Sequence, residues 1–332
     1  MREGTEPRLL YSLSAHRWEQ ALISQRRVVS AFYTLISRER LISALGVNPW
    51  LTDSRGEKRV EVRLAGGLGN QLFQFAAGWE IAERLGAPLY MNTSGLSKSG
   101  TPRKFELEEV VQGVASWGAD STSRRLFAQK GFSYDENVLK VRNGTLLQGY
   151  FQSPKFFSST NTVVLDLIRK SDAFNRGEMV DVQPFLALQI RRGDYLKTQN
   201  QRIHGIVPEE FFLRALEFLR KIHGALDVIV FSDDANTAER LAKEIPRAFA
   251  HHPPTSESPL QTLGLLSKAS GFAISNSSFG WWGAFLAGAQ STVIVPRPWF
   301  KDLALNTRDL FPEKWLSLGI GHSCAGKPNF DF

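Results

Sequence analysis

Short apolar runs alternate with helix-length stretches through the second half of this 332-residue chain. The apolar runs indicate strands, and the longer stretches between them indicate helices. The strands are expected at 185–190, 228–231, 272–275 and 292–295, and the helices at 208–222, 236–245, 260–268 and 279–289. Strands that alternate with helices favour a parallel sheet in a doubly wound α/β fold.

The first half of the chain is less regular. Val60, Val62 and Leu64 alternate as in a strand, and a glycine turn, a helix-length segment at 71–85 and a second strand at 88–91 follow. Residues 95–180 mix short elements that the pattern does not separate. We predict a basic N-terminal extension and linker over 1–57, an α/β domain over 58–178 and a Rossmann-like domain over 179–322.

The net charge of +7 is spread along the chain, because basic residues are interspersed with acidic ones. Without a lysine tract, zinc-finger spacing or aromatic-basic RNA signature, nucleic acid is a poor candidate ligand. The surplus of positive charge suits a diphosphate-bearing molecule or an anionic membrane.

The single cysteine, Cys324, favours a reducing compartment. No apolar run reaches the roughly 18 residues of a membrane span, so we expect a cytoplasmic protein. Residues 17–45 have two alternatives: basic helices on the inner membrane face, or packing on the main body.

Two adjacent arginines follow the predicted strand at 185–190. The run Arg191-Arg192-Gly193-Asp194 stands where a parallel strand ends, which is where α/β proteins bind ligands. Guanidinium groups match phosphate oxygens in two-pronged hydrogen bonds, and Asp194 can hold one arginine in place. The alternative is a surface turn with a solvated Arg–Asp pair.

A glycine turn at 65–74 links the first strand to the first helix. Gly67, Gly69 and Asn70 stand at the start of the helix, where backbone amides favour negative charge. The turn is not a dinucleotide fingerprint, because Leu72 replaces the third glycine. A tight turn without a ligand is the alternative.

Two aspartates, Asp233 and Asp234, close the predicted strand at 228–231. A carboxylate there can accept two N–H bonds from a guanine edge, and the alternative is a cap for the helix that follows.

A polar turn and two tryptophans follow the strand at 272–275. Ser277 and Ser278 place hydroxyls at a helix start, to cap the helix or to bind a phosphate. Trp281 and Trp282 point to different faces, so at most one lines a sugar pocket, and the alternative is core packing for both.

In this order, these motifs resemble those of the α-1,2-fucosyltransferases, a group that includes the bacterial galactoside 2-α-L-fucosyltransferases of glycosyltransferase family 11. The resemblance covers residues 59–320 and rests on Gly-Gly-x-Gly-Asn-Gln, Arg-Arg-Gly-Asp-Tyr, Phe-Ser-Asp-Asp and Asn-Ser-Ser-Phe-x-Trp-Trp-Gly-Ala. It implies a GT-B-like fold in which two Rossmann-like α/β domains face a cleft, with 58–178 as the acceptor-side domain and 179–322 as the GDP-sugar-binding domain.

The resemblance also implies a reaction. Such enzymes transfer L-fucose from GDP-β-L-fucose, with inversion, to the 2-hydroxyl of a galactoside in an oligosaccharide or lipid-linked glycan, and need no metal or other cofactor. Arg191 then stabilises the departing GDP, and Asp194 orients an arginine or the loop. The expected nucleotide-sugar contacts are Gly67, Gly69, Asn70, Gln189, Arg192, Asp233, Asp234, Asn276, Ser277, Ser278 and Phe279.

Two positions depart from the family pattern. Gln189 stands where histidine is usual, and glutamine keeps a donor and an acceptor but loses proton chemistry. Ser270 stands at a second position that is often histidine. The general base is open between Asp194, His204 and Glu209. The alternative functions are transfer of another GDP-sugar and non-catalytic binding of a GDP-sugar or glycan.

Overall fold

The structure, a computed structural model, describes residues 59–97, 102–123, 125–193 and 203–320, together with the backbone of 330–331. These residues belong to one compact unit, Ser54–Phe332. Three predictions lie outside the described residues, because they concern the extension 1–57, Asp194 and Cys324.

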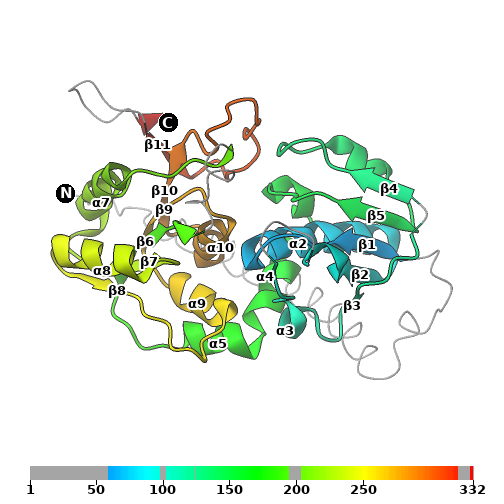
Figure 1. The fold of residues 1–332 in the computed structure, drawn as a ribbon, viewed down its shortest axis with the longest axis horizontal. Coiled ribbons are helices and arrows are strands. Elements are labelled where there is room, and N and C mark those ends of the chain that lie inside the picture. The colour runs from blue at the N-terminus through cyan, green and yellow to red at the C-terminus, as the bar shows by residue number, and fades with distance from the viewer. Residues whose placement is uncertain (1–58, 98–101, 124, 194–202, 321–329, 332) are drawn as a thin grey trace, which may run out of the picture. The chain divides into compact units, whose positions relative to one another are not determined.

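The described strands form two sheets (Figure 1). The first has the order β3-β2-β1-β5-β4, and its strands are parallel. They are β1 (Val60–Arg63), β2 (Leu89–Asn92), β3 (Ser116–Gly118), β4 (Arg125–Ala128) and β5 (Thr145–Gln148).

The second sheet has the order β12-β11-β10-β9-β6-β7-β8, and all neighbours are parallel except β11 and β12. Its strands are β6 (Phe185–Ile190), β7 (Asp227–Ser232), β8 (Ala248–Ala250), β9 (Gly271–Ile274), β10 (Thr292–Arg297), β11 (Leu316–Gly319) and β12 (Phe330–Asp331).

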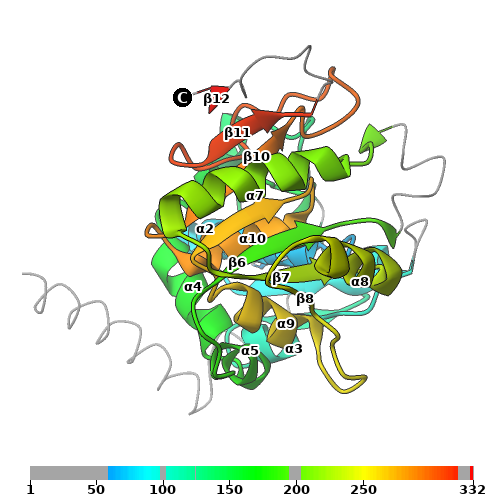
Figure 2. The same cartoon turned by 90° about the vertical axis from the view of Figure 1, so that its left-hand side faces the viewer.

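Helices pack against both sheets, and Figure 2 shows α7 lying across the second one. The helices are α2 (Leu68–Leu85), α3 (Glu108–Val111), α4 (Asn161–Arg169), α5 (Asp172–Glu178), α7 (Glu209–His223), α8 (Ala235–Glu244), α9 (Pro259–Leu266) and α10 (Ser278–Ala287). Short 3₁₀ helices lie at Thr93–Gly95, Glu136–Lys140 and Pro154–Phe157.

Strand β6 shows why this sequence forms a doubly covered sheet. All of its residues are buried, and successive side chains of a strand point to opposite faces. Leu186, Leu188 and Ile190 pack in the cluster that includes α7. Phe185 and Ala187 pack in the other cluster, which includes α9 and α10. The predicted α/β fold with two Rossmann-like halves, as in GT-B proteins, is confirmed.

The two sheets are joined by helix packing. Helix α2 contacts α10, and α5 contacts α9. The ring centroid of Phe73 on α2 lies 4.5 Å from that of Trp281 and 5.1 Å from that of Trp282. Both tryptophans are fully buried, so the structure supports core packing for the pair.

Candidate functional site

Three neighbouring strands of the second sheet bring the predicted motifs to one edge. Strand β6 lies between β9 and β7, and all three are parallel. Their carboxyl ends therefore place Arg191, Asp233 and Ser277 in adjacent loops. This edge is the ligand-binding edge of open α/β sheets.

Asp233 connects two of these loops. Its Oδ2 lies 2.8 Å from Nη1 of Arg191, and its Oδ1 accepts the backbone N–H of Arg192 at 2.8 Å. A Cβ at Gly193 would lie 2.2 Å from Oδ2, so this approach requires glycine. Asp233 thus contacts Arg191 in the way that the sequence analysis expected of Asp194, which lies outside the described residues. Its Oδ2 pairs with Arg191, and its Oδ1 accepts the Arg192 N–H. Its predicted contact with guanine stays a prediction.

The two arginines have different surroundings. Arg192 is 7% exposed, and its Nη1 donates to the carbonyl oxygens of Val207 at 3.1 Å and Arg191 at 3.2 Å. Its Nη2 lies 3.8 Å from Glu209, whose carboxylate also pairs with Arg240. Burial lowers the pKa of Arg192, yet a guanidinium stays charged. Arg191, with 25% of its side chain exposed, is better placed to meet a phosphate.

Ser275, which the sequence analysis did not single out, joins β6 to the turn before α10. Its Oγ accepts the N–H of Arg191 at 2.9 Å, and its backbone N–H donates to the Gln189 carbonyl at 2.8 Å. Its carbonyl oxygen accepts the N–H of Ser277 at 2.7 Å. The sequence feature that could have identified Ser275 is its position, because it is a polar residue directly after a buried strand.

Gln189 lies beneath these loops. It is 5% exposed, its Oε1 accepts from Ser275 Oγ at 3.2 Å, and a Cβ at Gly280 would lie 2.4 Å from that oxygen. Gln189 is therefore buried beneath the turn before α10 and contacts it through Ser275. Its predicted contact with the nucleotide stays a prediction.

The first turns of α2 and α10 touch each other. A Cβ at Gly69 would lie 2.5 Å from the Phe279 nitrogen and 2.5 Å from the Ser278 carbonyl carbon. Ser277 is the N-cap of α10, and its side chain makes no capping hydrogen bond within the described residues. The N-terminus of α10 is therefore suited to an anion.

The turn before α2 is fixed by side-chain amides. Gln71 Nε2 donates to the Gly66 and Lys104 carbonyls at 3.0 and 2.8 Å, and its Oε1 accepts the Glu106 N–H at 3.0 Å. Asn70 Oδ1 accepts from Gln152 Nε2 at 2.7 Å.

Glu106, which the sequence analysis did not single out, lies at this turn. Burial raises the pKa of its carboxyl, against the opposite effects of the Leu68 N–H and of Arg103. Because Glu106 already receives a hydrogen bond from the first turn of α2, α10 is the stronger anion site of the two.

Asn276 and Asp234 have local partners. Asn276 Nδ2 donates to the carbonyl oxygens of His204 at 2.7 Å and Trp299 at 3.0 Å. Asp234, the N-cap of α8, accepts from Thr237 Oγ1 at 2.6 Å. Their predicted contacts with the nucleotide stay predictions.

The described general-base candidates, His204 and Glu209, differ in environment. Burial lowers the pKa of His204, and the charge of Arg191 lowers it further, so the imidazole is neutral at neutral pH. The His204 ring lies 5.5 Å from that of Phe300. Glu209 is paired with Arg240. Asp194, the third candidate, is outside the described residues.

Among the described residues, no group of three or more His, Cys, Asp or Glu side chains is placed to hold a metal ion. The helices of these residues include none with the length and hydropathy of a membrane span.

Comparison with known proteins gives a family match. The model of glycosyl transferase family 11 matches residues 133–319. The chain is 27% identical over 300 residues to the O-antigen biosynthesis glycosyltransferase WbnK of Escherichia coli, covering 77% of this chain and 99% of WbnK. It is 26% identical over 289 residues to an alpha-1,2-colitosyltransferase of Escherichia coli, with coverages of 78% and 98%. It is 25% identical over 294 residues to a galactoside 2-alpha-L-fucosyltransferase of Caenorhabditis elegans, with coverages of 77% and 78%.

Proposed function

Because the chain belongs to glycosyl transferase family 11, we propose that it moves L-fucose from GDP-β-L-fucose, with inversion, to the 2-hydroxyl of a galactoside in a glycan. The ordered motifs and the similarity to a galactoside 2-alpha-L-fucosyltransferase support this donor and linkage. The similarity to an O-antigen biosynthesis glycosyltransferase supports a glycan acceptor.

One observation carries the proposal: a cation and a helix N-terminus share one edge of the second sheet. Arg191 is oriented by Asp233 at 2.8 Å, and Ser275 connects its backbone to the turn that starts α10. A guanidinium beside helix amides is an arrangement that binds phosphate oxygens. The diphosphate of GDP-fucose is proposed to bind here, with the positive charge coming from the protein and no metal required.

The chemistry follows from that placement. The oxygen of the acceptor hydroxyl attacks C1 of the fucosyl group from the face opposite the phosphate, which inverts C1. The bond from C1 to the β-phosphate oxygen breaks, and its electron pair stays with GDP. Arg191 and the amides of α10 stabilise the negative charge that grows on that oxygen, so their interaction is stronger in the transition state than in the ground state.

The hydroxyl proton needs an acceptor, for which we favour His204. Burial and Arg191 both lower its pKa, so the imidazole is neutral and has a ring nitrogen that can take the proton as the new glycosidic bond forms, although the same effects make it a weaker base. Glu209 is a weaker candidate, because its carboxylate pairs with Arg240 and lies 3.8 Å from Arg192.

A second candidate function is transfer of another activated sugar to the same kind of acceptor. The similarity to an alpha-1,2-colitosyltransferase, which is as extensive as the similarity to WbnK, supports this alternative. The residues that choose between donors are those around the transferred sugar rather than those around the diphosphate.

The direct test measures GDP release from GDP-fucose by the purified protein, with and without lactose or N-acetyllactosamine. We expect release that depends on the galactoside, and a product whose NMR spectrum shows fucose on the 2-hydroxyl. Faster release from a different GDP-sugar would favour the second candidate. GDP binding without release from any donor would favour a non-catalytic binding protein.

A further inference from the structure

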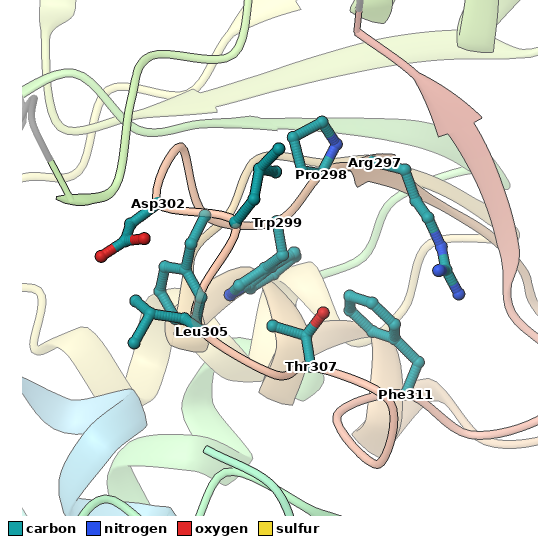
Figure 3. Close-up of a pocket in the computed structure, with 9 residues that line it drawn as sticks. Arg297, Pro298, Trp299, Asp302, Leu305, Thr307 and Phe311 are labelled. Atoms are coloured by element: carbon teal, nitrogen blue, oxygen red, sulfur yellow. The ribbon is translucent and has the colours of Figure 1, made fainter. Parts of the chain in front are cut away.

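The loop between β10 and β11 lines a partly open cavity of about 350 Å³ (Figure 3). Its lining comes from the last residue of β10 and from the loop that follows, together called the 297–311 loop here. The lining residues are Arg297, Pro298, Trp299, Phe300, Asp302, Leu303, Leu305, Thr307 and Phe311. The cavity has the size of a small-molecule site, at the lower end of the usual range.

The cavity adjoins the proposed reaction site. Strand β10 is the neighbour of β9, so the 297–311 loop leaves the same edge of the sheet as the turn before α10. Asn276 Nδ2 donates to both the Trp299 and His204 carbonyls, at 3.0 and 2.7 Å. Phe300, which lines the cavity, packs 5.5 Å from the His204 ring. The proposed proton acceptor is therefore next to this wall of the cavity.

The chemistry of the lining suits a sugar ring. The rings of Trp299 and Phe311 lie 5.1 Å apart at 73°, and Figure 3 shows them with Thr307 in the middle of the lining. Arg297 and Asp302 lie at opposite ends of it. A pyranose has an apolar face of C–H groups and an edge of hydroxyls, which match aromatic surfaces and flanking polar groups respectively.

The 297–311 loop is tied to the rest of the protein at several points. Asp309 Oδ1 lies 2.5 Å from Lys155 Nζ, and its Oδ2 accepts the Tyr134 N–H at 3.1 Å. Trp281 Nε1 donates to the Leu310 carbonyl at 2.9 Å. A cavity that is formed before the ligand arrives costs less ordering on binding.

The order of the loops along the sheet indicates which ligand belongs in the cavity. The loop after β7 carries Asp234, the loop after β6 carries Arg191, and the 297–311 loop follows β10 on the far side of β9. A GDP-sugar bound as proposed, with its base near Asp234 and its diphosphate at Arg191, directs its transferred sugar towards the 297–311 loop. The acceptor then approaches that sugar from the side away from the diphosphate. We infer that this cavity binds the sugar ring of the acceptor galactoside, an inference that rests on the proposed transferase function.

The test fills the cavity with a bulky side chain. We propose two variants, Thr307→Trp in the middle of the lining and Leu305→Trp at a partly exposed position. The matched control is Leu213→Trp, at an exposed leucine that lines another hollow, between α7 and the end of α8. Calorimetry on the full chain measures the binding of lactose and N-acetyllactosamine to the GDP-saturated protein, and of GDP alone. Circular dichroism confirms the fold of each variant.

We expect both cavity variants to weaken galactoside binding by about tenfold or more while GDP affinity changes by less than about twofold. The control should match the wild type in both measurements. Galactoside binding that survives in a folded cavity variant would overturn the inference. If the cavity variants lose affinity for GDP and not for the galactoside, the inference is also overturned, because the cavity would then hold the nucleotide.

Wild-type protein that binds GDP but none of the galactosides contradicts the inference too. By contrast, galactoside binding that the cavity variants abolish, combined with no transfer from GDP-fucose, contradicts the proposed function and leaves the cavity assignment standing.

Discussion

At the scale of single residues, the central feature is that two adjacent arginines have different surroundings: Arg191 is partly exposed and Arg192 is buried. The sequence placed Arg191 and Arg192 together after a strand, and the structure confirms that placement. The sequence alone could not show that the two arginines have different surroundings. Arg192 is buried by Val207 and Glu209, which are distant from it in the sequence. The role of Asp233 was equally hidden, because it depends on β7 lying beside β6.

Asp233→Ala tests whether this carboxylate acts through Arg191. Without it Arg191 loses its orienting partner, and we expect kcat to fall by about tenfold to a hundredfold. The double variant Asp233→Ala/Arg191→Ala should be no slower than Arg191→Ala, because the two residues act as one unit. Multiplied defects would contradict the coupling.

The control for this cycle is Asp227→Ala. Asp227 begins the same strand, β7, and pairs with Arg247 at 2.7 Å, at the opposite end of the strand from Asp233. We expect its steady-state kinetics to match those of the wild type.

At the scale of elements, the central strands and long helices were predictable, whereas short edge strands were not. β6, β9 and β10 are apolar and buried, so their pattern is plain. β8 spans Ala248–Ala250 and leaves Phe249 59% exposed, so little burial pattern marks it. β3 and β4 in the first sheet are similarly exposed, which explains why residues 95–180 gave no clear pattern.

Two glycines of one turn should respond differently to alanine. A Cβ at Gly69 would meet the backbone of Ser278 and Phe279 at 2.5 Å, so Gly69→Ala should destabilise the fold by about 1–3 kcal/mol. Gly67, with φ of −82°, has open space for a Cβ among the described residues. Gly67→Ala should keep its stability and raise the KM for GDP-fucose, as the predicted nucleotide contact requires.

Urea unfolding and initial-rate kinetics on the pair check this expectation. Equal stability of the two variants would contradict the close contact of α2 with α10. An unchanged KM for GDP-fucose in Gly67→Ala would remove Gly67 from the donor site.

At the scale of the whole described unit, the two sheets share one apolar cluster and a polar link through Asp309. Burial acts to raise the pKa of Asp309, but hydrogen bonds from Lys155, the Tyr134 N–H and Arg308 outweigh it, so the pKa is lowered. A lowered folded-state pKa contributes stability that is present above the unfolded-state value of about 3.9 and is lost as the pH falls through the folded-state value.

Asp309→Asn should therefore destabilise the protein by about 1–3 kcal/mol at neutral pH, because it removes a buried charged acceptor. The free-energy difference from the wild type should shrink as the pH falls below about 4, since the wild-type carboxyl is then protonated too. Urea unfolding across this pH range measures it. A difference that stays constant with pH would contradict the role of the charge.

The measurement that tests the account most directly is the kcat/KM of Arg191→Ala with GDP-fucose and lactose. The account predicts a fall of about 10²–10³-fold with an unchanged unfolding temperature, while Arg247→Ala, in the exposed pair at the other end of β7, matches the wild type. Near-normal turnover by folded Arg191→Ala would contradict the placement of the diphosphate at this edge of the sheet.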